Sequence, residues 1–291
     1  MFLTLLNILA PTFLSASAGY LWGRSGKPFD NNFIALLIMD IGAPCLIIST
    51  LGSLTLPAKA LLEFGGLILL TLGLTSIVLY LLLRLGGKDI RTFLVPVVFG
   101  NHANIGLPVC YFAFGGEGLA LALLYYALVS FFHFTAGVAL ISGDLKLLPM
   151  LRKPIIAATL FSFLLLGLDL HLPEWLLNTV TLLGEMTIPL MLVTLGVSLA
   201  RLRVNNLAES VVLAGYRVFI GLAVGILVAT LFELQGVARG VLILQAGMPL
   251  AIFNYLLAER YRREPEQVAG MVVVSTLMSV VLLPFVLQMV I

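Results

Sequence analysis

The sequence predicts an all-α membrane protein of ten transmembrane helices, arranged as two inverted repeats of five helices each. Three observations support this fold class. Among the 291 residues, 61% are hydrophobic and 10% are charged, whereas soluble domains carry about 25% charged residues. The apolar residues gather in ten segments of spanning length. Short motifs also recur at nearly equal offsets in the two halves of the chain.

Ten apolar segments make up most of the chain, and a helix needs roughly 20 apolar residues to cross a bilayer. We expect spans over residues 3–22, 31–51, 60–83, 92–114, 117–141, 155–170, 175–200, 207–232, 238–259 and 267–290. The first segment resembles a signal peptide at Ala16-Ser17-Ala18 but has no basic leading region, so we keep it as span 1. Five spans in each half give a first repeat over 1–141, a connecting loop over 142–154 and a second repeat over 155–291.

Lysine and arginine are distributed unevenly between alternate loops. Two, Lys59 and Arg239, lie on one side of the predicted membrane, and thirteen lie in the loops after spans 1, 3, 5, 7 and 9. Those thirteen are Arg24, Lys27, Arg84, Lys88, Arg91, Lys146, Arg152, Lys153, Arg201, Arg203, Arg260, Arg262 and Arg263. Positively charged loops remain in the cytoplasm. We therefore expect a multi-pass protein of the cell's inner (plasma) membrane with both termini on the non-cytoplasmic side. Because topology explains the basic loops, they do not indicate nucleic-acid binding.

Spans 2 and 7 share a motif in which an acid precedes a proline by four residues. Asp40 and Pro44 form it in span 2, and Glu185 and Pro189 form it 145 residues later in span 7. Acids inside a membrane are costly and usually functional, so both are candidates for ion coupling or gating. The alternative is that each only bonds to a neighbouring helix, as Glu185 would with Arg217.

Spans 4 and 9 contain a second pair of motifs, each ending in glycine, an apolar residue and proline. Residues 101–108 read Asn-His-Ala-Asn-Ile-Gly-Leu-Pro and residues 245–249 read Gln-Ala-Gly-Met-Pro, with the two prolines 141 residues apart. The two offsets, 141 and 145 residues, agree with an internal duplication. Since each half has an odd number of spans, the second repeat must enter the membrane in the opposite sense.

Glycine and proline in the middle of a span break the helix and free backbone groups that lipid cannot satisfy. Paired breaks of this kind mark the binding site of a secondary transporter. We expect half-helices to start near Pro108 and Pro249, so that their positive ends face a carboxylate. The candidate substrate-binding side chains are Asn101, His102, Asn104, Gln245 and Asn254, and the candidate architectural residues of the crossing are Gly106, Pro108, Gly247 and Pro249. The alternative is that these amides only satisfy the freed backbone groups.

The sequence contains no motif for an enzyme, a metal or a cofactor. Cys45 and Cys110 both lie inside predicted spans and do not indicate a disulfide framework. There is no His-Glu-x-x-His motif, phosphate loop or nucleophile elbow. We therefore predict a non-enzymatic protein that uses no cofactor.

At these motifs the sequence resembles the auxin efflux carrier family, in its bacterial, PIN-like branch. Further residues that carry the resemblance are 258–261, Pro265 and Pro284. The resemblance implies that spans 4 and 9 unwind and cross, as in bile-acid symporters and sodium/proton antiporters, and that carboxylates are exported by an elevator-type motion. It also implies that Asn101 contacts the substrate carboxylate, that Gln245 holds the corresponding place in span 9, and that Glu63 lies near the cavity.

The predicted function is a secondary transporter that exports small organic anions across the bilayer, driven by the membrane potential. We expect spans 3–5 and 8–10 to form a moving transport domain and spans 1, 2, 6 and 7 a scaffold, through which the resemblance implies a homodimer. One alternative is a sodium- or proton-coupled symporter or antiporter of the same fold, with Asp40 or Glu185 as its ion site. An alternative of another class is a non-transporting membrane receptor or assembly subunit.

Overall fold

The computed structural model describes all residues except 1, 53–57, 144–153, 169 and 171. The regular secondary structure of the described residues is helical, and their β pairing is limited to one isolated bridge between Gly100 and Leu250. Among the described residues, seven helical stretches, several of them made of consecutive helices, are long and apolar enough to cross a membrane. The prediction of an all-helical, multi-pass membrane protein is therefore confirmed. Most of the predicted central loop, including Lys146, Arg152 and Lys153, lies outside the described residues.

The helices of the first half follow the predicted apolar segments. They are α1 (Phe2–Arg24), α2 (Asn31–Leu37), the π-helical turn η1 (Ile38–Gly42), α3 (Ala43–Gly52), α4 (Ala58–Leu85), α5 (Ile90–Val98), the π-helical turn η2 (His102–Gly106), α6 (Leu107–Phe132), the π-helical turn η3 (His133–Gly137) and α7 (Val138–Ser142). Asp89 caps α5, and the hydroxyl of Thr92 donates to its carboxylate, which lowers the pKa of the Asp89 carboxyl.

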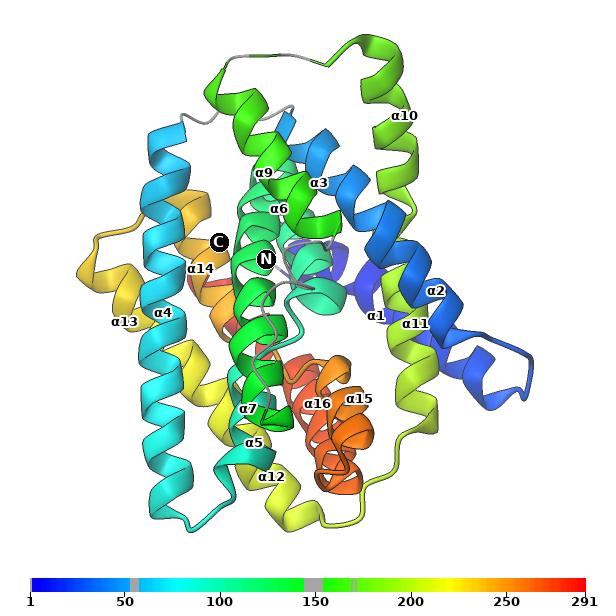
Figure 1. Ribbon diagram of the computed structural model, residues 1–291, viewed down its shortest axis with the longest axis vertical. Coiled ribbons are helices and arrows are strands. Elements are labelled where there is room, and N and C mark those ends of the chain that lie inside the picture. The colour runs from blue at the N-terminus through cyan, green and yellow to red at the C-terminus, as the bar shows by residue number, and fades with distance from the viewer. Residues whose placement is uncertain (1, 53–57, 144–153, 169, 171) are drawn as a thin grey trace.

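The second half is divided in a similar way. Its helices are α9 (Pro154–Gly167), α10 (Glu174–Glu185), α11 (Thr187–Arg201), α12 (Leu207–Gly215), the π-helical turn η4 (Tyr216–Ile220), α13 (Gly221–Leu231), α14 (Gly236–Ala246), α15 (Ile252–Tyr261) and α16 (Pro265–Val290). Figure 1 shows long helices running roughly along the vertical axis, with α4 at one side, α10 and α11 at the other, and the shorter α14 and α15 between them.

One helix is interrupted at a glycine, and regular α-helix also ends at the two acid-proline motifs. Gly115 interrupts α6 with φ 66° and ψ −150°, a conformation that glycine adopts readily. The predicted end of span 4, at residue 114, and the predicted start of span 5, at residue 117, lie on either side of Gly115. In the acid-proline motifs, Asp40 lies within the π-helical turn η1, and Glu185 is the last residue of α10, before Met186 separates it from α11.

Two groups of helices pack closely within themselves. In one group, α1 packs along α11, and α3 packs against α9 and α10. Gly196 allows α1 and α11 to approach, because a Cβ there would overlap the carbonyl oxygen of Ala16. In the other group, α6 and α13 pack against α14, α12 and α15 pack against α16, and α4 packs against α5 and α6.

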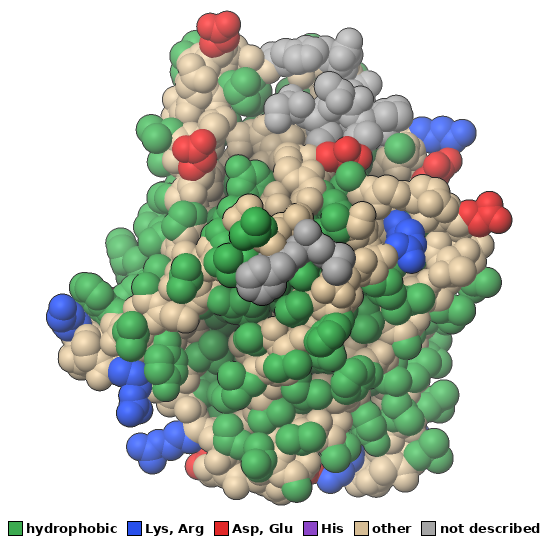
Figure 2. Space-filling view, turned by 180° about the vertical axis from the view of Figure 1, so that it is seen from behind, with side chains coloured by type: hydrophobic (Ala, Val, Ile, Leu, Met, Phe, Trp, Pro, Cys, Tyr) green, Lys and Arg blue, Asp and Glu red, His purple; other side chains and the backbone are tan. Residues whose placement is uncertain are grey.

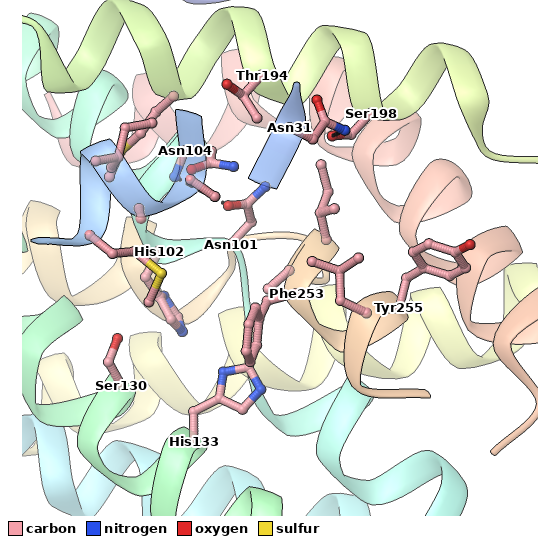
Figure 3. A pocket seen from close by; sticks show the side chains of 18 of the residues that line it. Asn31, Asn101, His102, Asn104, Ser130, His133, Thr194, Ser198, Phe253 and Tyr255 are labelled. Atoms are coloured by element: carbon pink, nitrogen blue, oxygen red, sulfur yellow. Dashed lines mark hydrogen bonds between the residues drawn. The ribbon is translucent and has the colours of Figure 1, made fainter. Parts of the chain in front are cut away.

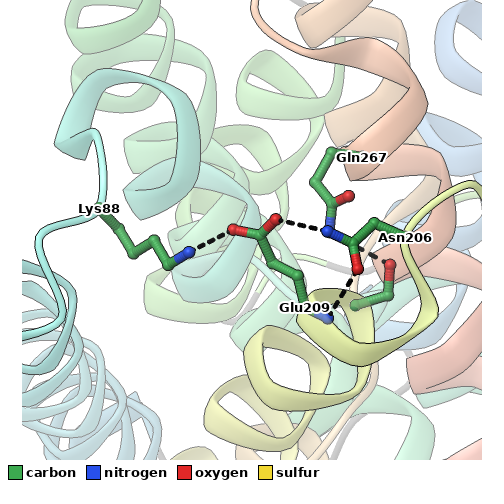
Figure 4. Close-up of polar contacts among 5 residues, drawn as sticks. Lys88, Asn206, Glu209 and Gln267 are labelled. Atoms are coloured by element: carbon green, nitrogen blue, oxygen red, sulfur yellow. Dashed lines mark hydrogen bonds and ion pairs between the residues drawn. The ribbon is translucent and has the colours of Figure 1, made fainter.

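A polar cluster joins three segments of the second group at one end of the bundle (Figure 4). Lys88, just before α5, forms an ion pair with Glu209 of α12 at 2.5 Å. Asn206 caps α12 by accepting from the backbone N–H of Glu209, and Gln267 of α16 donates to the hydroxyl of Ser210. These contacts tie the starts of α5, α12 and α16 together.

The exterior is apolar, as lipid requires. Figure 2 shows hydrophobic side chains spread over the middle of one face, with charged side chains toward its edges. Leu62, Leu85 and Leu182 are among the large apolar side chains that are more than two-thirds exposed. Exposure of this extent is unusual on a soluble protein and expected on a surface that faces lipid tails.

Candidate functional site: a crossing of two broken helices

Both predicted breaks are present. The first lies between Val98, where α5 ends, and His102, where η2 begins, and the second lies between Ala246 and Ile252. Asn101 caps the new helical turn, because its Oδ1 accepts from the backbone N–H of Asn104 at 3.2 Å. The half-helix therefore begins at His102, six residues before Pro108, and the prediction that it starts near Pro108 is wrong; η2 continues directly into α6, where Pro108 lies in the first turn. The half-helix of the second break begins at Ile252, three residues beyond Pro249.

The two broken segments cross and satisfy each other's backbone. The N–H of Asn101 donates to the carbonyl of Pro249 at 2.6 Å, and the N–H of Ala251 donates to the carbonyl of Phe99 at 3.4 Å. Between these bonds Gly100 and Leu250 form the isolated antiparallel bridge. Because water and lipid cannot supply these partners in a membrane, the crossing stabilises both breaks at once.

The carbonyl ends of the two half-helices meet at Arg217, which is 2% exposed. Its guanidinium donates to the carbonyls of Val98 (2.8 Å), Ala246 (3.1 Å) and Met248 (2.9 Å). The suggested pairing of Glu185 with Arg217 is therefore wrong. All three nitrogens of the guanidinium bond to carbonyls that the helix breaks set free.

Two predicted site residues, Gln245 and Asn254, are fully buried in the crossing itself. His102 Nδ1 donates to Oε1 of Gln245 at 3.1 Å, and Nε2 of Gln245 donates to the carbonyl of His102 at 3.4 Å. Asn254 Nδ2 donates to the carbonyls of Phe99 (2.8 Å) and Pro96 (3.4 Å), which end α5. Both amides thus bond to groups of the crossing.

A cavity of about 380 Å³ lies against the other side of the crossing (Figure 3). Its volume is within the range of small-molecule sites. The polar side chains that line it are Asn31, Asn32, Asn101, His102, Asn104, Tyr126, Ser130, His133, Thr194, Ser198, Arg201 and Tyr255. They come from α2 and α11 on one side, and from η2, α6, η3 and α15 on the other.

Three buried polar atoms of this lining have no hydrogen-bond partner among the described residues: Asn101 Nδ2, Asn31 Oδ1 and Thr194 Oγ1. Figure 3 shows Asn31 and Thr194 in the upper part of the view, with Asn101 below them. Buried polar groups are almost always paired, so a set of unpaired ones around a cavity indicates that a ligand or water completes them. The set includes an amide donor, an amide acceptor and a hydroxyl.

The electrostatics of the cavity favour a negative ligand. The N-terminal turns of η2 and α15 border it through residues 101–104 and 251–253, and α15 has no side-chain cap. Helix N-termini carry about half a positive charge and attract anions. Within the described part of the chain, Arg201 is the one charged residue of the lining, and no acid lines it.

The other predicted candidates lie away from this cavity. Asp40 and Glu185 are exposed and outside its lining. Glu63 is exposed on α4 and forms an ion pair with Lys59 at 3.8 Å. Gly106 serves the crossing, because a Cβ there would overlap Oε1 of Gln245.

Sequence reasoning missed the face that α2 and α11 contribute. Thr194, Ser198 and Arg201 recur at spacings of four and three residues, which places them on one face of α11. Asn31 donates to the hydroxyl of Ser198 at 3.3 Å and so connects α2 to this face. A polar stripe in an apolar span was the signal that could have found them. Among the described residues, no group of His, Cys, Asp and Glu could hold a metal ion.

Comparison with known proteins shows the family to which the chain belongs. A family model described as "Membrane transport protein" matches residues 4–146 and 138–287. The chain is 24% identical over 267 residues to an uncharacterized transporter of Methanocaldococcus jannaschii, covering 85% of each chain. It is 26% identical over 268 residues to an uncharacterized transporter of Methanothermobacter thermautotrophicus, covering 88% of this chain and 87% of the relative. These relatives are transporters and not enzymes. The chain therefore belongs to the membrane transport protein family, that of the auxin efflux carriers.

Proposed function

We propose that this membrane transport protein is a secondary carrier that exports small organic anions, chiefly carboxylates, by an elevator-type alternating-access mechanism. The observation that carries the proposal is the Asn101 amide. Its Nδ2 is buried without a partner, in a cavity that is bordered by two helix N-termini and has no acid among its described lining residues. A carboxylate oxygen would accept from this amide and lie in the field of both helix ends.

The proposed architecture has ten spans in two inverted repeats, 1–141 and 155–291. Its support is that Gly115 divides α6 at the predicted boundary between spans 4 and 5. Further support comes from the equivalent positions of the helix breaks: η1 and Met186 lie at the acid-proline motifs, and Gly100 pairs with Leu250 where the two broken helices cross.

The proposed motion divides the chain between the two groups of packed helices. Spans 1, 2, 6 and 7 would form the scaffold, with α1, α3, α9, α10 and α11 packed together. Spans 3–5 and 8–10 would form the transport domain, in which the cluster around Lys88 and Glu209 connects α5, α12 and α16 at one end. The cavity lies between these groups, where an elevator carrier would expose its substrate first to one side and then to the other.

The position of the cavity also supports a proposal for the side of the membrane that it faces in this structure. Arg201 borders it at the end of α11, next to the loop that contains Arg203. If basic loops lie in the cytoplasm, then the cavity faces the cytoplasm, and both termini lie outside. An exporter would load its substrate in this state. Arg201, an exposed cation at the rim, would attract the incoming anion.

The scaffold is also the proposed surface for a homodimer in the inner membrane. Asp40 and Glu185 are exposed on scaffold helices near the middle of their spans. A charged carboxylate facing lipid is costly, so cover by a second subunit would remove that cost.

The proposed function is tested by binding to the purified protein. A panel of small carboxylic acids is screened by thermal shift, and each acid is paired with its own neutral primary amide. A ligand at 100 times its Kd stabilises the folded state by about 2.7 kcal/mol. We expect particular carboxylates to raise the melting temperature while their amides do not. Equal stabilisation by acid and amide, or stabilisation by organic cations alone, would contradict an anion site.

A further inference from the structure

Arg217 occupies an unusual position for a charged side chain. It lies in the π-helical turn η4, in the middle of the segment formed by α12 and α13, and is almost completely buried. Its three hydrogen bonds go to the carbonyls of Val98, Ala246 and Met248. These three oxygens belong to the C-terminal end of α5 and to the end of α14 with the segment that follows it.

The charges at this point balance. A helix C-terminus carries about half a negative charge, so the two ends that meet here carry about one negative charge together. The guanidinium supplies one positive charge. Among the described residues, Arg217 forms no ion pair with a carboxylate. The two helix ends therefore balance the positive charge of Arg217, and Arg217 balances their partial negative charges.

The backbone around the guanidinium leaves it only the space that it needs. A Cβ on Gly100 would overlap Nη2 of Arg217. A Cβ on Gly221, one turn after Arg217, would overlap the carbonyl of Ala246. Two glycines on separate segments thus keep the carbonyl cluster open to a planar group.

We propose that Arg217 is a built-in cation that holds the crossing together, in the place where an ion-coupled carrier with such breaks would bind a metal cation. Carbonyl oxygens at the C-terminal ends of half-helices are ligands for sodium in broken-helix carriers. Neutralising Arg217 turns the cluster of Val98, Ala246 and Met248 carbonyls into a binding site for a monovalent cation. The inference deepens the proposed function, since it explains how a carrier with crossed helices would work without a coupling ion.

The test measures the melting temperature of the purified full-length protein in choline chloride and in sodium or lithium chloride at equal concentration. Arg217→Gln should lower the melting temperature in choline chloride by at least about 5 °C, because three buried carbonyls lose a charged donor. Sodium or lithium should restore at least half of this loss. The melting temperature of the wild type should be the same in all three salts. The same should hold for Arg217→Lys, which keeps the positive charge.

The matched control is Arg239→Gln. Arg239 also donates to a helix-end carbonyl, that of Met289 at 3.2 Å, but it does so at the surface, and its variant should show no response to sodium. The proposal is overturned if Arg217→Gln melts alike in all salts, or if Arg217→Lys responds to sodium as strongly as Arg217→Gln. If Arg217→Gln does not fold in any salt, Arg217→Lys decides: a folded, sodium-insensitive protein supports the proposal, and failure to fold despite the charge overturns it. Because the readout is stability and not flux, a failed search for a carboxylate substrate would not affect this result.

Discussion

Replacing Asn101 by aspartate tests the candidate site most directly, because the two side chains have nearly the same shape. Asn101 caps η2 through its Oδ1, and aspartate caps a helix about as well as asparagine. Its Nδ2 has no partner among the described residues. The substitution therefore preserves the helix cap and replaces the unpaired Nδ2 donor of Asn101 by a negatively charged oxygen, which can only accept.

The expected loss of affinity follows from that exchange. A hydrogen bond to a charged group contributes about 1.5–3 kcal/mol, and each 1.4 kcal/mol changes an affinity tenfold. Loss of the donor alone should raise the Kd for a carboxylate roughly 10- to 100-fold. Repulsion between two carboxylates adds to this in a site of low dielectric constant. We expect a combined loss of at least about 100-fold, with little change in the melting temperature of the empty protein.

The assay is calorimetric titration of the purified protein with a carboxylate found by the thermal-shift screen. Asn206→Asp is the matched control. Asn206 caps α12 through the same kind of bond, accepting from the N–H of Glu209 at 3.2 Å, but it lies outside the cavity lining. If Asn101→Asp binds as tightly as wild type, or if Asn206→Asp loses as much affinity, the assignment of Asn101 to the anion is refuted.

Four further predictions follow from the site and from the proposed topology. Arg201→Gln should slow anion association and weaken its dependence on salt, as measured by stopped flow, because Arg201 is the one charged lining residue among those described. Gly106→Leu should lower both transport and the melting temperature, because even a Cβ there overlaps the amide packed against it. An introduced cysteine at Lys59 should react with an impermeant thiol reagent outside intact cells, while one at Arg262 should not; the opposite pattern would invert the topology. Efflux from proteoliposomes at a clamped potential should persist without a sodium or proton gradient, and a gradient requirement that Asp40→Asn relieves would favour the coupled alternative.

The helix breaks could be predicted from the sequence because glycine and proline act on the backbone locally. The motifs at residues 101–108 and 245–249 place both breaks correctly, and Asn101 follows from them because it precedes the new helical turn. The starts of the half-helices were misplaced, the first by six residues (His102 instead of Pro108) and the second by three (Ile252 instead of Pro249). Proline suits a first helical turn, but at Pro249 the extended segment continues so that its carbonyl can accept from Asn101. That partner is distant in sequence, so local rules could not show it.

The roles of the polar side chains depended on packing that the sequence does not display. Gln245 and Asn254 carry the same amide group as Asn101, yet their amides bond within the crossing. Which amide nitrogen is left without a partner is decided by the direction of each side chain once the helices cross. The spacing of Thr194 and Ser198 is visible in the sequence, but that their face borders the cavity depends on the rotation of α11. The predicted pairing of Glu185 with Arg217 was wrong because a carboxylate is not the only group that can balance the charge of an arginine. Here the carbonyl groups at the helix ends balance it.

The charges at the crossing also determine the step on which a membrane potential would act. Arg217 is always protonated, and it belongs to the group of helices proposed to move. With a bound monocarboxylate, the moving body would carry no net formal charge at the crossing, whereas the empty carrier would carry one positive formal charge, because a helix dipole has partial charges but no net charge. A potential of 100 mV is worth about 2.3 kcal/mol for each charge that crosses it, so it would act on the return of the empty carrier. A negative cytoplasm would draw that positive charge inward and so reset an exporter. Net efflux should therefore accelerate with a more negative cytoplasm, while exchange of anion for anion, in which the carrier moves only when loaded, should hardly respond. Equal voltage dependence of the two modes would place the moving charge elsewhere than Arg217.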